Sequence, residues 1–216
     1  MSMQRIANYG SFLQAYALKQ LIEELGHKVE FVDYHVGAPV IAENADSKNK
    51  FVRKLEKGLE TFRYQAPPSH KFSFIRYKQS FAKKYMPLLG ITDEMNYNPT
   101  LDSLVIGSDE VFNCIQKNSN VGYSTELLGK DNHADRVITY AASFGNTTLE
   151  KLEKYQKANE IGNLLKKFDA ISVRDANSGS IVEQLTGEEP VYNLDPVLTY
   201  DYMNCCNRIP QIKATE

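Results

Sequence analysis

Apolar residues recur at helical spacing in the first part of the chain and predict an amphipathic helix there. Its apolar face is formed by Leu13, Ala17, Leu18, Leu21, Ile22 and Leu25. The helix follows a tight turn at 8–10, and we expect Ser11 as its N-cap and Gly26 at its end. Strands are expected on both sides of it, over 1–6 and 28–33, so this region predicts a β–α–β opening.

Short apolar runs later in the chain predict further strands, over 104–106, 137–142, 168–173 and 191–194. Helices are expected over 149–166 and 178–185, and the first of these carries so much charge that it should lie on the surface. Alternating strands and helices are typical of a parallel sheet covered by helices. The pattern therefore predicts an α/β protein with a Rossmann-like parallel sheet flanked by helices.

The first predicted strand is unusually short. Only Met1, Met3 and Ile6 are apolar before the turn, whereas a buried parallel strand normally has a longer apolar run. We therefore expect either that the true start of the protein lies upstream or that this end has been trimmed.

Residues 47–86 interrupt the alternation and are expected to form a helical basic insertion. Apolar spacing predicts helices over 51–62 and 69–85, after a loop at 35–46. Residues 47–86 contain eleven Lys or Arg and two Glu. These charges form either a solvated helix surface or a patch that attracts an anionic surface, such as the inner membrane face or a lipid-linked phosphate.

Composition excludes several classes of protein. The chain has 216 residues, of which 42% are hydrophobic and 24% charged, as in soluble globular domains. A net charge of -2 gives no overall attraction to nucleic acid, and three cysteines form neither a disulfide framework nor a metal-binding spacing. We see no signal peptide and no apolar run of about 18 residues, so a cytoplasmic location is expected, with peripheral contact at the inner membrane face as an option.

Small, polar and charged residues follow the predicted strands, and we expect them to line a ligand site: Asn8, Tyr9, Gly10, Ser11, Gly107, Ser108, Asp109, Ser143, Arg174 and Asp195. The carboxyl ends of parallel strands meet at one edge of the sheet, where α/β proteins bind ligands. Asp109 can act as a base or orient a sugar hydroxyl, or it can cap the following turn. Arg174 can bind a carboxylate or phosphate, or form a salt bridge with Asp175 or Asp195. The turn before Ser11 aims a helix N-terminus at this edge, which suits an anion, although it can also serve only to reverse the chain.

Six blocks in a fixed order carry a resemblance to a known family: NYGSFLQAY at 8–16, VDY at 32–34, IGSDEVFN at 106–113, YAASFG at 140–145, ISVRD at 171–175 and LDPVL at 194–198. Together they resemble the polysaccharide pyruvyl transferase family of bacterial cell-surface glycan synthesis. The resemblance implies transfer of pyruvate from phosphoenolpyruvate onto sugar hydroxyls as a ketal, with no further cofactor and no metal. The implied acceptor is a saccharide or a lipid-linked oligosaccharide.

The resemblance also implies two Rossmann-like domains facing across a cleft, as in B-type glycosyltransferases. Residues 1–200 are then expected to form the N-terminal domain, and 201–216 a tail or linker toward an absent second domain. For the chemistry, Asp109 is expected to accept the hydroxyl proton and Arg174 to neutralise phosphate or carboxylate charge. A sugar-nucleotide glycosyltransferase domain and a non-catalytic domain that binds a glycan or partner are the alternatives. Self-association into a homo-oligomer is also expected, through the face where a second domain would dock.

Overall fold

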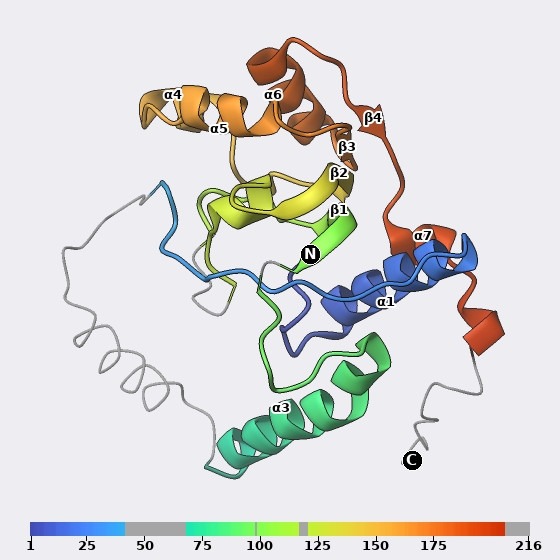
Figure 1. Ribbon diagram of the computed structural model, residues 1–216. Coiled ribbons are helices and arrows are strands. Elements are labelled where there is room, and N and C mark those ends of the chain that lie inside the picture. The colour runs from blue at the N-terminus through green and yellow to red at the C-terminus, as the bar shows by residue number, and fades with distance from the viewer. Residues whose placement is uncertain (42–67, 98, 117–120, 206–216) are drawn as a thin grey trace.

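The computed structural model describes residues 1–41, 68–97, 99–116 and 121–205. Within them, four strands form a parallel sheet in the order β1-β2-β3-β4. The strands are β1 (Thr100–Asp109), β2 (His133–Ala142), β3 (Ser172–Val173) and β4 (Val191–Tyr192). β1 and β2 pair along most of their length, whereas β3 pairs with β2 and with β4 over only one or two residues. The sheet with its flanking helices confirms the predicted Rossmann-like α/β fold (Figure 1).

Helices lie on both sides of the strands (Figure 1). On one side are α4 (Leu149–Lys154), α5 (Ala158–Leu165) and α6 (Ala176–Thr186). On the other are α1 (Tyr9–Glu24), α7 (Pro196–Thr199) and α3 (Pro68–Leu89). Short 3-10 helices span Thr125–Leu128 and Tyr202–Cys205. None of the helices in the described ranges is long and apolar enough to cross a membrane.

The prediction of one surface helix over 149–166 is wrong. The chain breaks between α4 and α5 at Gln156, which has a left-handed φ of 56°. The break lets both short helices turn an apolar side inward, since Leu152, Ile161 and Leu165 are fully buried despite the charged surroundings. The helix predicted over 69–85 is confirmed as α3, whereas the helix predicted over 51–62 lies outside the described residues.

Two groups of apolar side chains stabilise the fold. The larger group lies around the sheet, where Leu104 and Ile106 of β1 pack with Phe112 and Phe144. The second group joins α1 to α3 and is aromatic: Phe12, Tyr16, Phe81 and Tyr85 are among its members. Burial of such large side chains contributes roughly 1.5–3 kcal/mol each, so the second group holds α1 against α3.

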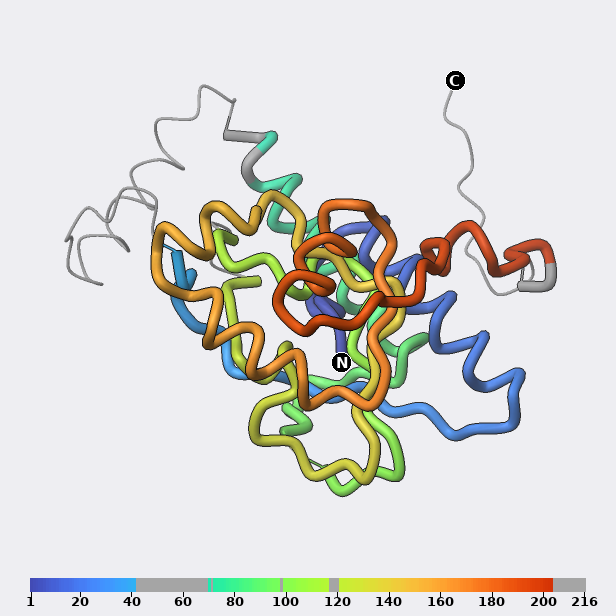
Figure 2. Tube along the Cα trace, turned by 90° about the horizontal axis from the view of Figure 1, so that it is seen from above, coloured from blue at the N-terminus to red at the C-terminus, as the bar shows by residue number. Residues whose placement is uncertain are grey.

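The predicted β–α–β opening is wrong, because neither 1–6 nor 28–33 forms a strand. In segment 1–6, Met1 pairs with the β1 backbone and the Ser2 hydroxyl donates to the Ser108 carbonyl at 3.3 Å. The backbone pairing of segment 28–33 is an isolated parallel bridge between Asp33 and Tyr97. No strand lies between segment 28–33 and β1, so side chains hold this segment in place. Arg5 donates to both carboxylate oxygens of Asp33, at 2.6 and 2.7 Å. Viewed from above, the amino terminus lies in the middle of the molecule (Figure 2).

Candidate functional site

Asp109 ends β1 at the carboxyl edge of the sheet, in a left-handed conformation with φ of 81°. Asp is one of the few residues other than Gly that tolerates this region. Its carbonyl accepts from the Ser143 amide at 3.0 Å, which ties the ends of β1 and β2 together. Its carboxylate accepts from the Glu110 amide at 2.9 Å and from Ser11 Oγ at 3.1 Å. The side chain is therefore aimed at the start of α1.

Arg174 follows β3 directly and connects two acidic side chains. Its Nη1 donates to Asp195 Oδ2 at 2.7 Å, and its Nη2 lies 3.7 Å from Asp109 Oδ1. The salt bridge with Asp195 that the sequence left open is thus present. Asp175 instead caps α6, where its carboxylate accepts from the amide and the hydroxyl of Ser178. Arg174 therefore ties the end of β1 to the segment that follows β4.

Asp195 has two roles, one for each carboxylate oxygen. Its Oδ1 caps α7 by accepting from the Val197 amide at 3.0 Å, and its Oδ2 accepts from Arg174 and from Gln14 Nε2. Sequence reasoning did not select Gln14. The available signal was its position one turn after Ser11, which puts both side chains on the same face of α1. We call Ser11, Gln14, Asp109, Arg174 and Asp195 the edge cluster.

The edge cluster is close to solvent and carries a net negative charge. The side chains of Asp109, Arg174 and Asp195 are 20%, 23% and 17% exposed. Two carboxylates face one guanidinium, so one negative charge is not balanced within the cluster. Such a group can accept hydrogen bonds from hydroxyls, but it offers an anionic ligand little attraction while Arg174 is held by Asp195.

The predicted role of Ser11 as N-cap is wrong, because the cap of α1 is Asn8. The Asn8 carboxamide oxygen accepts from the Gly10 amide at 2.7 Å and the Ser11 amide at 3.3 Å. These are the donors that an anion at the helix start would use, so the cap replaces the predicted anion site. The Asp109 carboxylate near Ser11 places negative charge at this positive helix end instead.

The remaining predicted site residues lie around the cluster without joining it. Ser108 and Ser143 are buried, and Ser143 Oγ accepts from the Gly145 amide at 2.9 Å. Gly107 approaches β2 closely, since a Cβ there would lie 2.2 Å from the Tyr140 carbonyl oxygen. Tyr9 is 46% exposed and packs on the aromatic side chains of α3. The predicted role of these residues in substrate binding stays a prediction.

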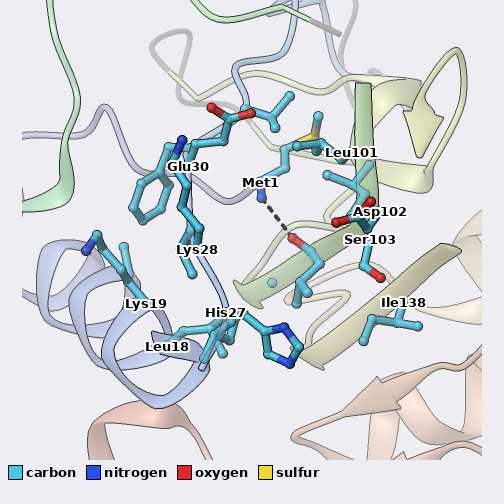
Figure 3. Close-up of a pocket in the computed structure, with 18 of the residues that line it drawn as sticks. Met1, Leu18, Lys19, His27, Lys28, Glu30, Leu101, Asp102, Ser103 and Ile138 are labelled. Atoms are coloured by element: carbon cyan, nitrogen blue, oxygen red, sulfur yellow. Dashed lines mark hydrogen bonds between the residues drawn. The ribbon is translucent and has the colours of Figure 1, made fainter. Parts of the chain in front are cut away.

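A cavity of about 510 Å³ lies apart from the edge cluster, between α1, segment 27–32 and β1 (Figure 3). Gly107 is the one predicted site residue that lines it. Its walls are mainly apolar side chains and the backbone of β1. Within the described ranges, no group of three or more His, Cys, Asp or Glu side chains is placed to hold a metal ion.

The fold and the edge cluster define a class of protein, namely a Rossmann-like α/β protein with polar side chains gathered at the carboxyl edge of its sheet. Comparison with known families gives the particular family. The model of polysaccharide pyruvyl transferase matches residues 8–213, nearly the whole chain, and the chain belongs to that family. The resemblance seen in the sequence is thereby confirmed. Separate comparisons with curated proteins and with solved structures found no match.

Proposed function

We propose that this chain takes part in transferring pyruvate from phosphoenolpyruvate onto two hydroxyls of a sugar, in the synthesis of a bacterial cell-surface polysaccharide. The observation that carries the proposal is the family match over 8–213 together with the position of Asp109 at the carboxyl edge. The acceptor is a saccharide or a lipid-linked oligosaccharide.

The reaction can be written with balanced atoms. The enol methylene carbon gains one proton, two sugar oxygens form bonds to the central carbon, and the bond from that carbon to the phosphate oxygen breaks. One hydroxyl proton replaces the proton taken up by the methylene, and the other leaves with phosphate. A carboxylate that accepts a hydroxyl proton therefore assists the attack, and we assign this role to Asp109.

The charge of the edge cluster supports acceptor binding rather than donor binding. Its unbalanced negative charge suits sugar hydroxyls, which donate hydrogen bonds, and opposes phosphoenolpyruvate, which is anionic. We therefore assign Arg174 a positioning role: it orients Asp109, Asp195 holds Arg174, and Gln14 in turn donates to Asp195. The expected role of Arg174 in neutralising the donor phosphate requires that Asp195 release it first.

Phosphate release from phosphoenolpyruvate, measured on the full-length polypeptide with a glycan acceptor, tests this proposal. Asp109→Asn is expected to lower the rate by about 100-fold or more, because the amide cannot accept the proton. Asp102→Asn is the matched control, since Asp102 lies exposed on the same strand. Full activity of Asp109→Asn would remove Asp109 from the mechanism. Release of a nucleoside diphosphate from a sugar nucleotide would favour a glycosyltransferase, and glycan binding without turnover would favour a binding domain.

We also propose that α3 contacts an anionic membrane surface, which would keep the protein near a lipid-linked acceptor. Phe72, Phe74 and Ile75, near the start of α3, are 74%, 56% and 54% exposed. The sequence of α3 contains five Lys or Arg and no Asp or Glu. Exposed aromatic residues beside basic ones are typical of helices that lie on membranes.

A further inference from the structure

The contact between β2 and β3 contains one extra residue on the β2 side. Ile138 pairs with Ala170, and Ala142 pairs with Val173, so four steps along β2 match three steps along the segment that ends in β3. Such a mismatch is a β-bulge. Bulges are uncommon between parallel strands, and they occur beside active sites, where they change the direction of a side chain.

Ala141 is the residue at which β2 departs from regular strand geometry. Its φ is 49°, in the left-handed region that residues other than Gly, Asn and Asp seldom adopt. Ala141 is also fully buried, and a Gly would adopt the same backbone at a lower cost. Neighbouring groups must therefore hold this part of the backbone in place.

Two hydroxyl groups close the interrupted ladder between β2 and β3. Ser172 Oγ accepts from the Ala141 amide at 2.9 Å and donates to the Thr139 carbonyl at 3.0 Å. In return, Thr139 Oγ1 accepts from the Ser172 amide at 2.7 Å and donates to the Ser172 carbonyl at 2.8 Å. Both side chains are buried, so these bonds satisfy backbone groups that would otherwise have no partner. Of the two hydroxyls, that of Ser172 bonds directly to Ala141.

Beyond the bulge, the backbone of β2 turns from β3 toward β1. The Ala141 amide points to β3, whereas the amide of Ser143, two residues later, donates to the Asp109 carbonyl at 3.0 Å. In an uninterrupted strand the amides of alternate residues point to the same side, so both would face β3. The bulge thus makes possible the bond that fixes the backbone of Asp109.

The extra residue also decides which side chain at the end of β3 lies inside. Val173 stands opposite Ala142 and is fully buried, and the next residue, Arg174, lies at salt-bridge distance from both aspartates of the edge cluster. Counted on from the pair of Ile138 and Ala170, an uninterrupted ladder would place Arg174 opposite Ala142. Because a shift of one residue exchanges the two faces of a strand, Arg174 would then take the place of Val173 in the core. The bulge therefore presents Arg174 to the edge cluster.

We propose that Ser172 is a positioning residue for the edge cluster. Its hydroxyl holds the bulge, and the bulge both directs an amide to Asp109 and presents Arg174. In the described part of the chain, this hydroxyl bonds to Ala141, Thr139 and Asn193 and to no member of the edge cluster, so it acts through the backbone. The effect on catalysis rests on the proposed function, whereas the effect on geometry does not.

Hydrogen exchange followed by NMR tests the geometry without any substrate. Ser172→Ala is expected to speed exchange of the Ser143 amide by about tenfold or more, because the bulge loses the hydroxyl that holds it. The Asp169 amide, which bonds to β2 ahead of the bulge, is the internal reference and should change by less than about twofold. Ser124→Ala is the matched control, because it removes a buried hydroxyl that caps the 3-10 helix at 125–128, and it should leave the Ser143 amide unaffected.

Unchanged exchange at Ser143, or equal acceleration at Ser143 and Asp169, would overturn the proposal. The hydroxyl would then affect only its own bonds, or the stability of the whole chain. Adding Ala141→Gly to Ser172→Ala should restore slow exchange in part, since Gly adopts a left-handed backbone without support. If Ser172→Ala alone does not fold, Ala141→Gly is compared with the double variant, with the same two amides and the same criteria.

A double-mutant cycle tests whether Ser172 acts through Arg174. In the Ser172→Ala background, Arg174→Gln should lower the free energy of unfolding in urea by at most about half as much as it does in the unaltered protein, because Arg174 is already displaced. Equal losses in the two backgrounds would contradict the link, since the Ser172 hydroxyl has no bond to Arg174.

Phosphate release from phosphoenolpyruvate, with a glycan acceptor that supports it in the unaltered protein, tests the link to catalysis. Ser172→Ala should lower this rate by about tenfold, and Ser172→Thr, which keeps the hydroxyl, should restore most of it. A full rate in Ser172→Ala would overturn the role in catalysis. If the unaltered protein releases no phosphate, the proposed function fails, while the exchange and unfolding results still decide whether Ser172 positions the edge cluster.

Discussion

Raising the pH from 5 to 8 is expected to stabilise this protein, because the amino group of Met1 is buried and burial disfavours its charged form. Burial lowers the pKa of this amine from 8.0 to about 5, although the nearby Asp33 carboxylate acts in the opposite direction. Between these two values the unfolded chain binds a proton that the folded chain does not. Stability therefore rises with pH across this interval, and the contribution is lost as the pH falls through 5.

The size of the effect follows from the same two values. Each unit of pKa difference corresponds to about 1.4 kcal/mol, so the shift is worth up to about 4 kcal/mol at pH 8 relative to pH 5. The steepest slope is about 1.4 kcal/mol per pH unit, because one group is involved.

Urea unfolding at a series of pH values measures this slope, with the retained Met1 verified by mass. The matched comparison is the same protein after enzymatic acetylation of its α-amine, which keeps the N–H donor to Val105 and removes the charge. Acetylation is expected to flatten the curve between pH 5 and 8 and to raise stability at pH 5. A free and an acetylated protein with the same slope would refute the assignment to Met1.

Three further changes test other features. Arg174→Gln should lower the free energy of unfolding in urea by about 1–2 kcal/mol, because Asp109 and Asp195 then face each other without a cation. Adding Asp195→Asn should recover part of this loss, and additive losses would contradict the coupling. Gly107→Ala should lower the free energy of unfolding by about 3 kcal/mol or more, because its Cβ would lie 2.2 Å from the Tyr140 carbonyl oxygen. Gly187→Ala, whose Cβ meets no atom within 4 Å, should lower it by about 1 kcal/mol, and equal losses would contradict the steric argument. Lys83→Glu with Lys84→Glu should lower binding to phosphatidylglycerol vesicles, measured by co-sedimentation, by about tenfold, whereas the matched pair Lys166→Glu with Lys167→Glu should not. An equal effect of the two pairs would show that overall charge, and not α3, determines the binding.

The strands with long apolar runs could be predicted from sequence. The run at Leu104–Ile106 and the one at Val137–Ala142 lie within β1 and β2, because burial on both faces requires such residues. The segment over 28–33 also has the composition of a strand, yet it forms none. Strand formation needs a neighbouring strand as well as suitable residues, and composition carries no information on whether that neighbour is present.

Part of the edge cluster could also be predicted. Ser11, Asp109, Arg174 and Asp195 were selected because they follow predicted strands, and parallel strand ends converge. For Gln14 the sequence offers its place one turn after Ser11 on the same face of α1, but it does not indicate the partner, Asp195, which lies 181 positions further along the chain. The cap of α1 was misplaced by three residues, since both Asn8 and Ser11 are good caps and only the backbone geometry distinguishes them.

The edge cluster also has a consequence for the order of folding. Its hydrogen bonds join residues that are far apart in the chain: 98 positions separate Ser11 from Asp109, and 181 separate Gln14 from Asp195. Contacts of this kind close long loops, so they form only after local helices and the β1–β2 pair have brought the segments together. The cluster is therefore expected to appear late in refolding and to open early when the chain loosens. Recovery of any activity that depends on Asp109 would then lag behind recovery of helical circular dichroism.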